Sequence, residues 1–137
     1  MNILAVDTEF DFTNPVWARL AGFSCSWTPG TAYYVPYTLA AIKFLQYRVN
    51  LADVVVMHNQ VVDSIVLTQH GLTIPYEKLH DTMVMAYVLR EEALGLKPLA
   101  LKYFNVRMTE IHEVVGSKKK SIVDLPPEQT YRYDAAD

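Results

Sequence analysis

The sequence has one cysteine, no long hydrophobic run and no excess of basic residues, and each shortage excludes a class of protein. Cys25 alone cannot form an internal disulfide or a multi-cysteine metal site, which fits a reducing compartment. The longest apolar run is the seven residues from Met83 to Leu89, whereas a membrane span needs about 18. We therefore expect a cytoplasmic protein with no membrane partner.

The charge of the chain excludes proteins that bind nucleic acid through an overall excess of basic residues. Twelve Lys and Arg residues against fifteen Asp and Glu residues give a net charge of -3. Any contact with a polyanion is therefore expected to be local or assisted by metal ions. With 51% hydrophobic and 20% charged residues, the composition is that of a globular chain, and 137 residues predict one domain over residues 1–137.

Strand patterns dominate the first half of the chain. Residues 2–6 are apolar on both alternating faces, which predicts a buried strand that ends where Asp7, Thr8 and Glu9 begin. Residues 19–27 and 32–35 predict a hairpin around the turn residues between them. Residues 53–58 predict a further short strand.

Helical patterns follow the hairpin. Thr38 is the expected N-cap of a helix that continues to Val49. Four more helices are expected over residues 61–70, 81–89, 97–104 and 128–137. Helices that alternate with strands predict an α/β or α+β fold, in which helices flank a mixed sheet.

Two acids lie at the end of the first predicted strand. Because side chains alternate along a strand, Asp7 and Glu9 share one face. Carboxylates this close repel one another and lose hydration, unless a cation neutralises both. Mg²⁺ or Mn²⁺ is the simplest cation to neutralise them, because these ions prefer hard oxygen ligands. A solvated strand end is the alternative interpretation of the pair.

Further candidates come later in the chain. Asp63 falls in the first turn of the helix after the strand at 53–58, where it would face a site or simply interact with the helix dipole. His58 and Asn59, just before it, could equally be hydrogen-bonding residues at the edge of the core. Tyr133 and Asp137 lie four residues apart, so they project from one face of the last helix, as ordinary surface pairs also do.

The order of these residues resembles the three exonuclease motifs of the DEDD superfamily, and specifically the 3′-5′ proofreading exonuclease domain of family A (Pol I-like) DNA polymerases. The resemblance covers Ile3 to Asp137 and implies a ribonuclease H-like fold with a mixed five-stranded sheet. Tyr133 implies the tyrosine type, since other members have a histidine where this chain has Arg132. The matching segments are Asp7-Thr8-Glu9, Tyr33-Tyr34-Val35-Pro36, His58-Asn59 with Asp63, His80-Asp81-Thr82-Met83, Ala86-Tyr87-Val88-Leu89, Leu94 to Ala100, Ser121 to Pro127, and Tyr133 with Asp137.

The chain departs from the family pattern at three places. The stretch between Pro36 and Asp53 is short, and Val62 stands where an aromatic residue usually precedes Asp63. The chain also ends on Asp137, so we expect a domain truncated at its C-terminal end. A polymerase domain in the same natural chain is the partner that the resemblance implies.

The resemblance also implies a two-metal mechanism. Asp7, Glu9 and Asp137 would bind one Mg²⁺ or Mn²⁺ ion, and Asp7, with Asp63 acting through a water, would hold a second. Tyr133 would orient the attacking water. The expected substrate is the 3′ end of single-stranded DNA, the products are 5′-mononucleotides, and the expected state is a monomer.

Substrate contacts are expected from Thr8, Phe10 and Asn59, with Phe10 stacking on a terminal base unless it belongs to the core. Two alternatives remain open at this point. One is a 3′-5′ RNA-trimming exonuclease of the same superfamily, because the catalytic carboxylates do not read the sugar. The other is a non-catalytic nucleic-acid-binding module.

Overall fold

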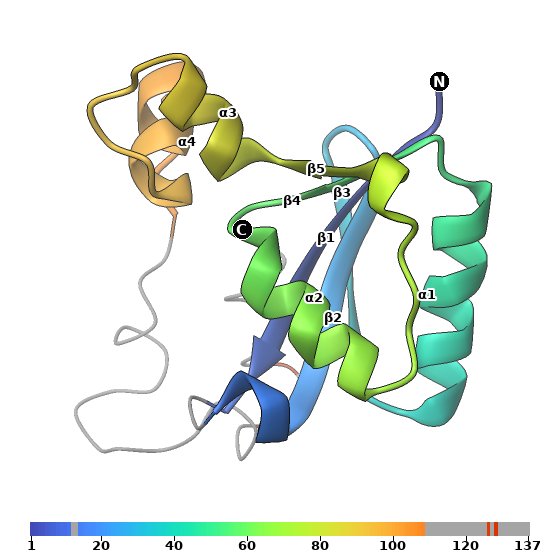
Figure 1. Cartoon of the computed structure of the whole chain (residues 1–137). Helices are drawn as coiled ribbons and strands as arrows, with labels where there is room; N and C mark the ends of the chain where they lie inside the picture. Colours follow the sequence, from blue (N-terminus) through green and yellow to red (C-terminus); the bar gives the residue numbers. More distant parts are fainter. Residues whose placement is uncertain (12–13, 109–125, 127, 129–137) are drawn as a thin grey trace.

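The computed structural model describes residues 1–11, 14–108, 126 and 128, which form a five-stranded mixed sheet with helices packed against it (Figure 1). The strand order is β3-β2-β1-β4-β5, with β1, β2 and β3 antiparallel and β4 and β5 parallel to β1. The mixed five-stranded sheet predicted above is thus confirmed. The strands are β1 (Ile3–Phe10), β2 (Leu20–Thr28), β3 (Thr31–Pro36), β4 (Val54–Met57) and β5 (Leu79–Asp81).

Two helices cover one face of the sheet, and two others lie together beyond the end of β5 (Figure 1). Thr38 caps α1 as predicted, since its Oγ1 accepts the Ala41 N–H at 2.9 Å. No helix among the described residues is long and apolar enough to cross a membrane. The helices are α1 (Leu39–Leu51), α2 (Gln60–Gln69), α3 (Thr82–Val88) and α4 (Leu96–Phe104), with single turns η1 (Pro15–Trp17) and η2 (Tyr76–Lys78).

The core lies between the sheet and the α1–α2 layer. Alternate residues of the central strands point into it, because side chains alternate along a strand. The buried apolar residues of the strands are Leu4, Val6, Leu20, Phe23, Cys25, Val55 and Met57, and those of the helices include Ile42, Leu45, Val49, Val66 and Leu67. This layer fixes the position of α2 against β1.

Two sequence-based expectations about the elements were wrong. The first strand does not end at Asp7 but continues to Phe10, because antiparallel pairing with β2 extends from Ala5↔Ser26 to Phe10↔Leu20. Asp81 does not begin a helix but ends β5 and precedes α3. A strand of three residues is too short to give an alternating pattern, so pairing with β4 alone defines it.

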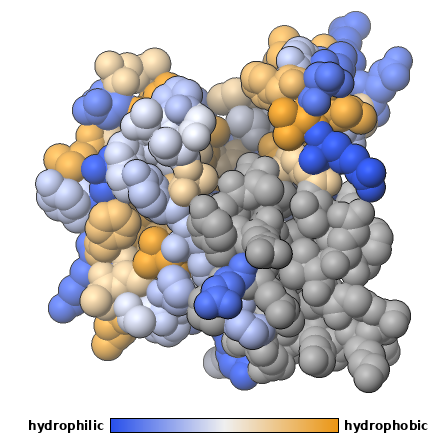
Figure 2. Space-filling model, turned by 180° about the vertical axis from the view of Figure 1, so that it is seen from behind, coloured by the Kyte–Doolittle hydropathy of each residue, from blue (hydrophilic) through white to orange (hydrophobic). Residues whose placement is uncertain are grey.

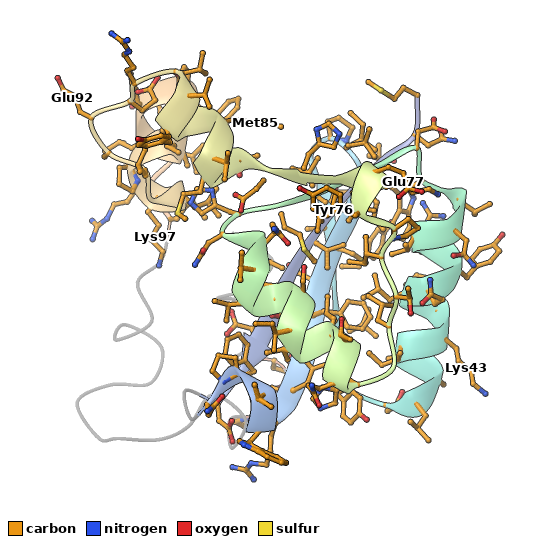
Figure 3. All side chains as sticks on the ribbon, viewed as in Figure 1. Lys43, Tyr76, Glu77, Met85, Glu92 and Lys97 are labelled. Carbon is orange, nitrogen blue, oxygen red and sulfur yellow. The ribbon has the colours of Figure 1, made fainter. Side chains whose placement is uncertain are left out.

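The α3–α4 unit carries an exposed apolar surface, seen as a concentration of hydrophobic side chains in Figure 2. Met85 projects from α3 in Figure 3, and a cavity of about 360 Å³ lies between the two helices. Among the described residues, the core cluster of the sheet includes none from α3 or α4. The unit therefore adds little to the sheet core, although β5 connects it directly to the sheet.

Candidate active site

The candidate site lies where β1 extends past the end of β4. The parallel register between these strands ends at Ala5↔Val56, while β1 continues to Phe10. The chain leaves β4 at Met57 and enters α2 three residues later, which brings the first turn of α2 to this edge of β1. Asp7 lies on the extended part of β1 and Asp63 lies in that first turn.

Thr8 connects β1 to α2. Its side chain points to the helix side of the sheet, and its hydroxyl donates a hydrogen bond to Asp63 Oδ1. Both side chains are buried, with exposed fractions of 6% each. Asp63 is therefore a buried acid with a partner on β1, whereas the simpler interpretation of its sequence position was an interaction with the helix dipole alone.

Burial acts on both aspartates, and the charge of Asp7 acts on Asp63 as well. Burial first, and the negative charge of Asp7 second, raise the pKa of Asp63 from 3.8 to about 7, against the hydrogen bond from Thr8. Burial also raises the pKa of Asp7, although a backbone hydrogen bond from Thr8 opposes the change. The doubly ionised pair is thus costly in the absence of a cation.

This pair fits a divalent metal ion. Carboxylate oxygens are the ligands that Mg²⁺ and Mn²⁺ prefer, and a cation would relieve the repulsion that raises the Asp63 pKa. Across the described ranges 1–11, 14–108, 126 and 128, no three His, Cys, Asp or Glu side chains are grouped to hold a metal ion. The described residues therefore contribute a pair of acids, and Asp137 lies outside them.

The remaining residues predicted for the site lie in different surroundings. Glu9 is buried and pairs with Gly22 in the β1–β2 register. Phe10 is half-buried and packs against the core. Asn59 is exposed, with φ 62° and ψ 49°, a left-handed conformation that asparagine tolerates well. Tyr133, like Asp137, lies outside the described residues.

A cavity of about 440 Å³ opens beside Asp7. His58 Nδ1 lies 2.8 Å from Thr82 Oγ1 at its wall. Burial lowers the pKa of His58, although the charge of Asp81 and a backbone hydrogen bond at Leu94 oppose this change. The imidazole is therefore neutral near pH 7 and adds no positive charge beside Asp7. The polar residues of the lining are Asp7, Ser24, Ser26, Thr31, His58 and Thr82.

Sequence reasoning did not select Asp81 as a site residue. Its carboxylate accepts hydrogen bonds from the backbone N–H groups that begin α2 and α3. The signal that could have found it is an aspartate directly before Thr82-Met83-Val84, which is a helix N-cap pattern. That pattern indicates a cap for α3, but not the contact with α2.

Comparison with known proteins gives a match over the whole chain. A family model of the exonuclease domain of family A DNA polymerases, described as 3′-5′ exonuclease, matches residues 1–137. DNA polymerase I of Synechocystis sp. is 32% identical over 148 residues, an alignment that covers 98% of this chain. The chain spans 15% of the length of that polymerase.

Solved structures of nucleases share the fold. Brucella melitensis NrnC superposes with a TM-score of 0.74 at 19% identity, over 99% of this chain and 68% of NrnC. Escherichia coli RNase D, described as an exoribonuclease involved in structured RNA processing, gives a TM-score of 0.70 at 16% identity, over 99% of this chain and 36% of RNase D. These similarities confirm the ribonuclease H-like fold.

Proposed function

Because the chain belongs to the family of 3′-5′ exonucleases, we propose that it removes 5′-mononucleotides stepwise from the 3′ end of single-stranded DNA. The observation that carries this proposal is the buried Asp63 held by Thr8 at the edge of β1, where the charge of Asp7 raises the pKa of Asp63. The sequence identity to a DNA polymerase I favours DNA as the substrate. It also favours a proofreading role for residues 1–137 beside a polymerase domain.

Divalent ions complete the proposed site. Two Mg²⁺ or Mn²⁺ ions would be held by Asp7, Glu9, Asp63 and Asp137, with Asp7 shared between them. An NrnC structure with bound Mg²⁺ has a TM-score of 0.70 to this chain. When bound, such ions supply the Lewis acidity that makes water a nucleophile near neutral pH and that stabilises charge on the leaving 3′ oxygen. They also supply the positive charge that an acidic protein needs to hold a phosphate.

The chain's own residues orient the reactants. Thr8 holds Asp63 in place through its hydroxyl group. Tyr133 would hold the attacking water by a hydrogen bond, and Phe10 and Asn59 would contact the terminal nucleotides. The cavity beside Asp7 lies at the edge of this arrangement and offers room for a nucleotide.

A strand-shortening assay tests the function. A 5′-labelled single-stranded DNA oligonucleotide, incubated with the chain and Mn²⁺, is expected to give a ladder that shortens from the 3′ end. Asp7→Ala is expected to abolish this ladder, because the variant lacks a carboxylate that both proposed ions need. Asp53→Asn is the matched control, since Asp53 is an exposed acid whose carboxylate accepts only the Asn2 N–H among the bonds described.

An RNA oligonucleotide of the same sequence separates the two substrate classes. RNase D acts on RNA and shares the fold with this chain, which makes RNA trimming the second candidate. Faster shortening of RNA than of DNA would reject the proofreading role while retaining the exonuclease. Binding of DNA without any shortening would favour the non-catalytic module, and activity retained in Asp7→Ala would reject the proposed site.

A further inference from the structure

One carboxylate joins the starts of two helices. Asp81 Oδ1 accepts the N–H groups of Met83 and Val84 at 2.8 and 3.4 Å, which caps α3. The same carboxylate accepts the N–H of Asn59 at 3.0 Å and that of Gln60, through Oδ2, at 2.9 Å. Asp81 therefore accepts hydrogen bonds from the start of α2, although it lies in a distant part of the chain.

The start of α2 has no side-chain cap of its own. Asn59 occupies the N-cap position, but it is in a left-handed conformation and makes no side-chain hydrogen bond to the helix. The first N–H groups of a helix need partners from outside the helix. The Asp81 carboxylate supplies them for Asn59 and Gln60, so it fixes the turn that joins β4 to α2.

Asp63 lies one turn into this helix. From Gln60 to Asp63 the helix rises about 4.5 Å, so any shift of the first turn moves Asp63 with it. Asp81 is itself held at the sheet, because it pairs with Met57 in the β4–β5 register. Asp63 is thus anchored at two points, through its own bond to Thr8 and through the turn that Asp81 holds.

We propose that Asp81 is a positioning residue, which sets the place of Asp63 by holding the first turn of α2 against the end of β5. The inference rests on the proposed function, in which Asp63 helps to hold a divalent ion. Burial would raise the pKa of Asp81, but its four backbone hydrogen bonds outweigh burial and lower it. The carboxylate is therefore ionised, and able to accept all four hydrogen bonds, at any pH at which the exonuclease would be active.

Substitution by serine separates the two roles of Asp81. Serine is a good N-cap, so Asp81→Ser keeps the cap of α3, but one short hydroxyl cannot also bridge to Asn59 and Gln60. Asp81→Asn is a second variant of nearly the same shape, which keeps one acceptor oxygen and loses the other. Asp53→Asn is the control, since Asp53 Oδ2 also accepts a backbone N–H, from Asn2 at 2.7 Å.

Three measurements on the full chain test the proposal. Hydrogen exchange without metal is expected to be faster at the amides of residues 59–63 in Asp81→Ser than in the unsubstituted chain, with a similar unfolding temperature. Calorimetric titration with Mn²⁺ alone is expected to show binding weakened about tenfold or more. In the strand-shortening assay, kcat is expected to fall by a similar factor, and KM is expected to change by less.

The outcomes distinguish the positioning role of Asp81 from the proposed exonuclease function. The positioning role would be overturned if Asp81→Ser and Asp81→Asn had the same Mn²⁺ affinity and exchange rates as the unsubstituted chain. It would also be overturned if Asp53→Asn lost as much Mn²⁺ affinity as the Asp81 variants. If the unsubstituted chain shortens no 3′ end, the proposed function fails. Weaker Mn²⁺ binding and faster exchange in the Asp81 variants would still support the positioning role in that case.

Discussion

The Thr8 hydroxyl donates a hydrogen bond to Asp63 Oδ1, which joins two residues 55 positions apart in the chain. Burial raises the pKa of Asp63, and this bond acts in the opposite direction. Thr8 therefore keeps a larger fraction of Asp63 ionised near neutral pH, which is the form that can ligate a cation. The middle residue of Asp7-Thr8-Glu9 thus has a role that the pattern of acids alone does not suggest.

Thr8→Val should move the pH dependence of cleavage. Valine keeps the shape of the side chain but cannot donate, so the pKa of Asp63 rises further and the acidic limb of the kcat profile moves to higher pH. A hydrogen bond to a charged group contributes about 1.5 to 3 kcal/mol, which predicts a loss of roughly tenfold or more at pH 7. Thr8→Ser keeps the donor and should retain the original profile. An unshifted profile in Thr8→Val would show that the bond does not tune Asp63.

Stability should fall as the pH rises through the neutral range when divalent ions are absent. The pKa of Asp63 is about 7 in the folded chain and 3.8 in its ordinary state, so the folded chain binds the extra proton between these values. The stabilisation is complete below 3.8 and is lost as the pH rises through the folded pKa. The unfolding free energy should therefore decrease over this window, by at most about 4 kcal/mol. Urea unfolding in EDTA at a series of pH values measures it.

Asp63→Asn isolates this contribution. Burial lowers the pKa of His58, which makes the folded chain more stable as the pH rises toward 7 and so opposes the effect of Asp63. The difference between the unsubstituted chain and Asp63→Asn removes the His58 contribution, because both proteins retain that histidine. The difference should grow with pH in favour of the variant. A constant difference would contradict the assigned pKa.

Divalent ions should restore the stability that is lost at high pH. At pH 8 both Asp7 and Asp63 are forced toward the ionised form, and a bound cation would neutralise their repulsion. Mn²⁺ at 100 times its dissociation constant should raise the unfolding free energy by about 2.7 kcal/mol. Asp7→Asn should abolish most of this increase, whereas Asp53→Asn should retain it. Equal stabilisation of all three proteins would place the ion elsewhere.

The local patterns of the chain predict most of the sheet and the two acids of the candidate site, Asp7 and Asp63. The hairpin, the strand before His58 and the cap at Thr38 all follow from alternation, turn residues and capping chemistry, which are properties of neighbouring residues. Asp63 could be placed in the first turn of its helix for the same reason. Whether the four acids meet around one ion stays a prediction, since Asp137 lies outside the described residues.

Contacts between distant segments could not be predicted in this way. The bond from Thr8 to Asp63 and the bonds from Asn59 and Gln60 to Asp81 depend on how α2 packs beside β1 and β5. Strand β5 exists only through its pairing with β4, and β1 is longer than predicted because β2 continues to pair with it. Polar residues in a sequence indicate that a partner is needed, but only the packed fold selects the partner.

Gly22 gives a test of how tightly the sheet packs beside the site. It pairs with Glu9, and a Cβ added to it would lie 2.5 Å from Tyr34 Oη and 2.7 Å from the Val35 carbonyl oxygen. The tyrosine ring could move, but the carbonyl oxygen belongs to β3 and cannot shift without disturbing the β2–β3 ladder. Gly22→Ala should therefore destabilise the fold by about 1 to 3 kcal/mol in urea unfolding.

Gly95→Ala is the matched control for Gly22→Ala, because its added Cβ would meet only Pro98 at ordinary contact distances of 3.4 and 3.6 Å. Its effect on stability should be smaller, limited to the N-cap position that Gly95 occupies before α4. Because Gly22→Ala pushes β2 away from β3 beside Glu9, it should also weaken Mn²⁺ binding, whereas Gly95→Ala should not. Equal effects of the two substitutions on both stability and Mn²⁺ affinity would mean that β2 tolerates a side chain at position 22, and that the register beside Glu9 is looser than these contacts indicate.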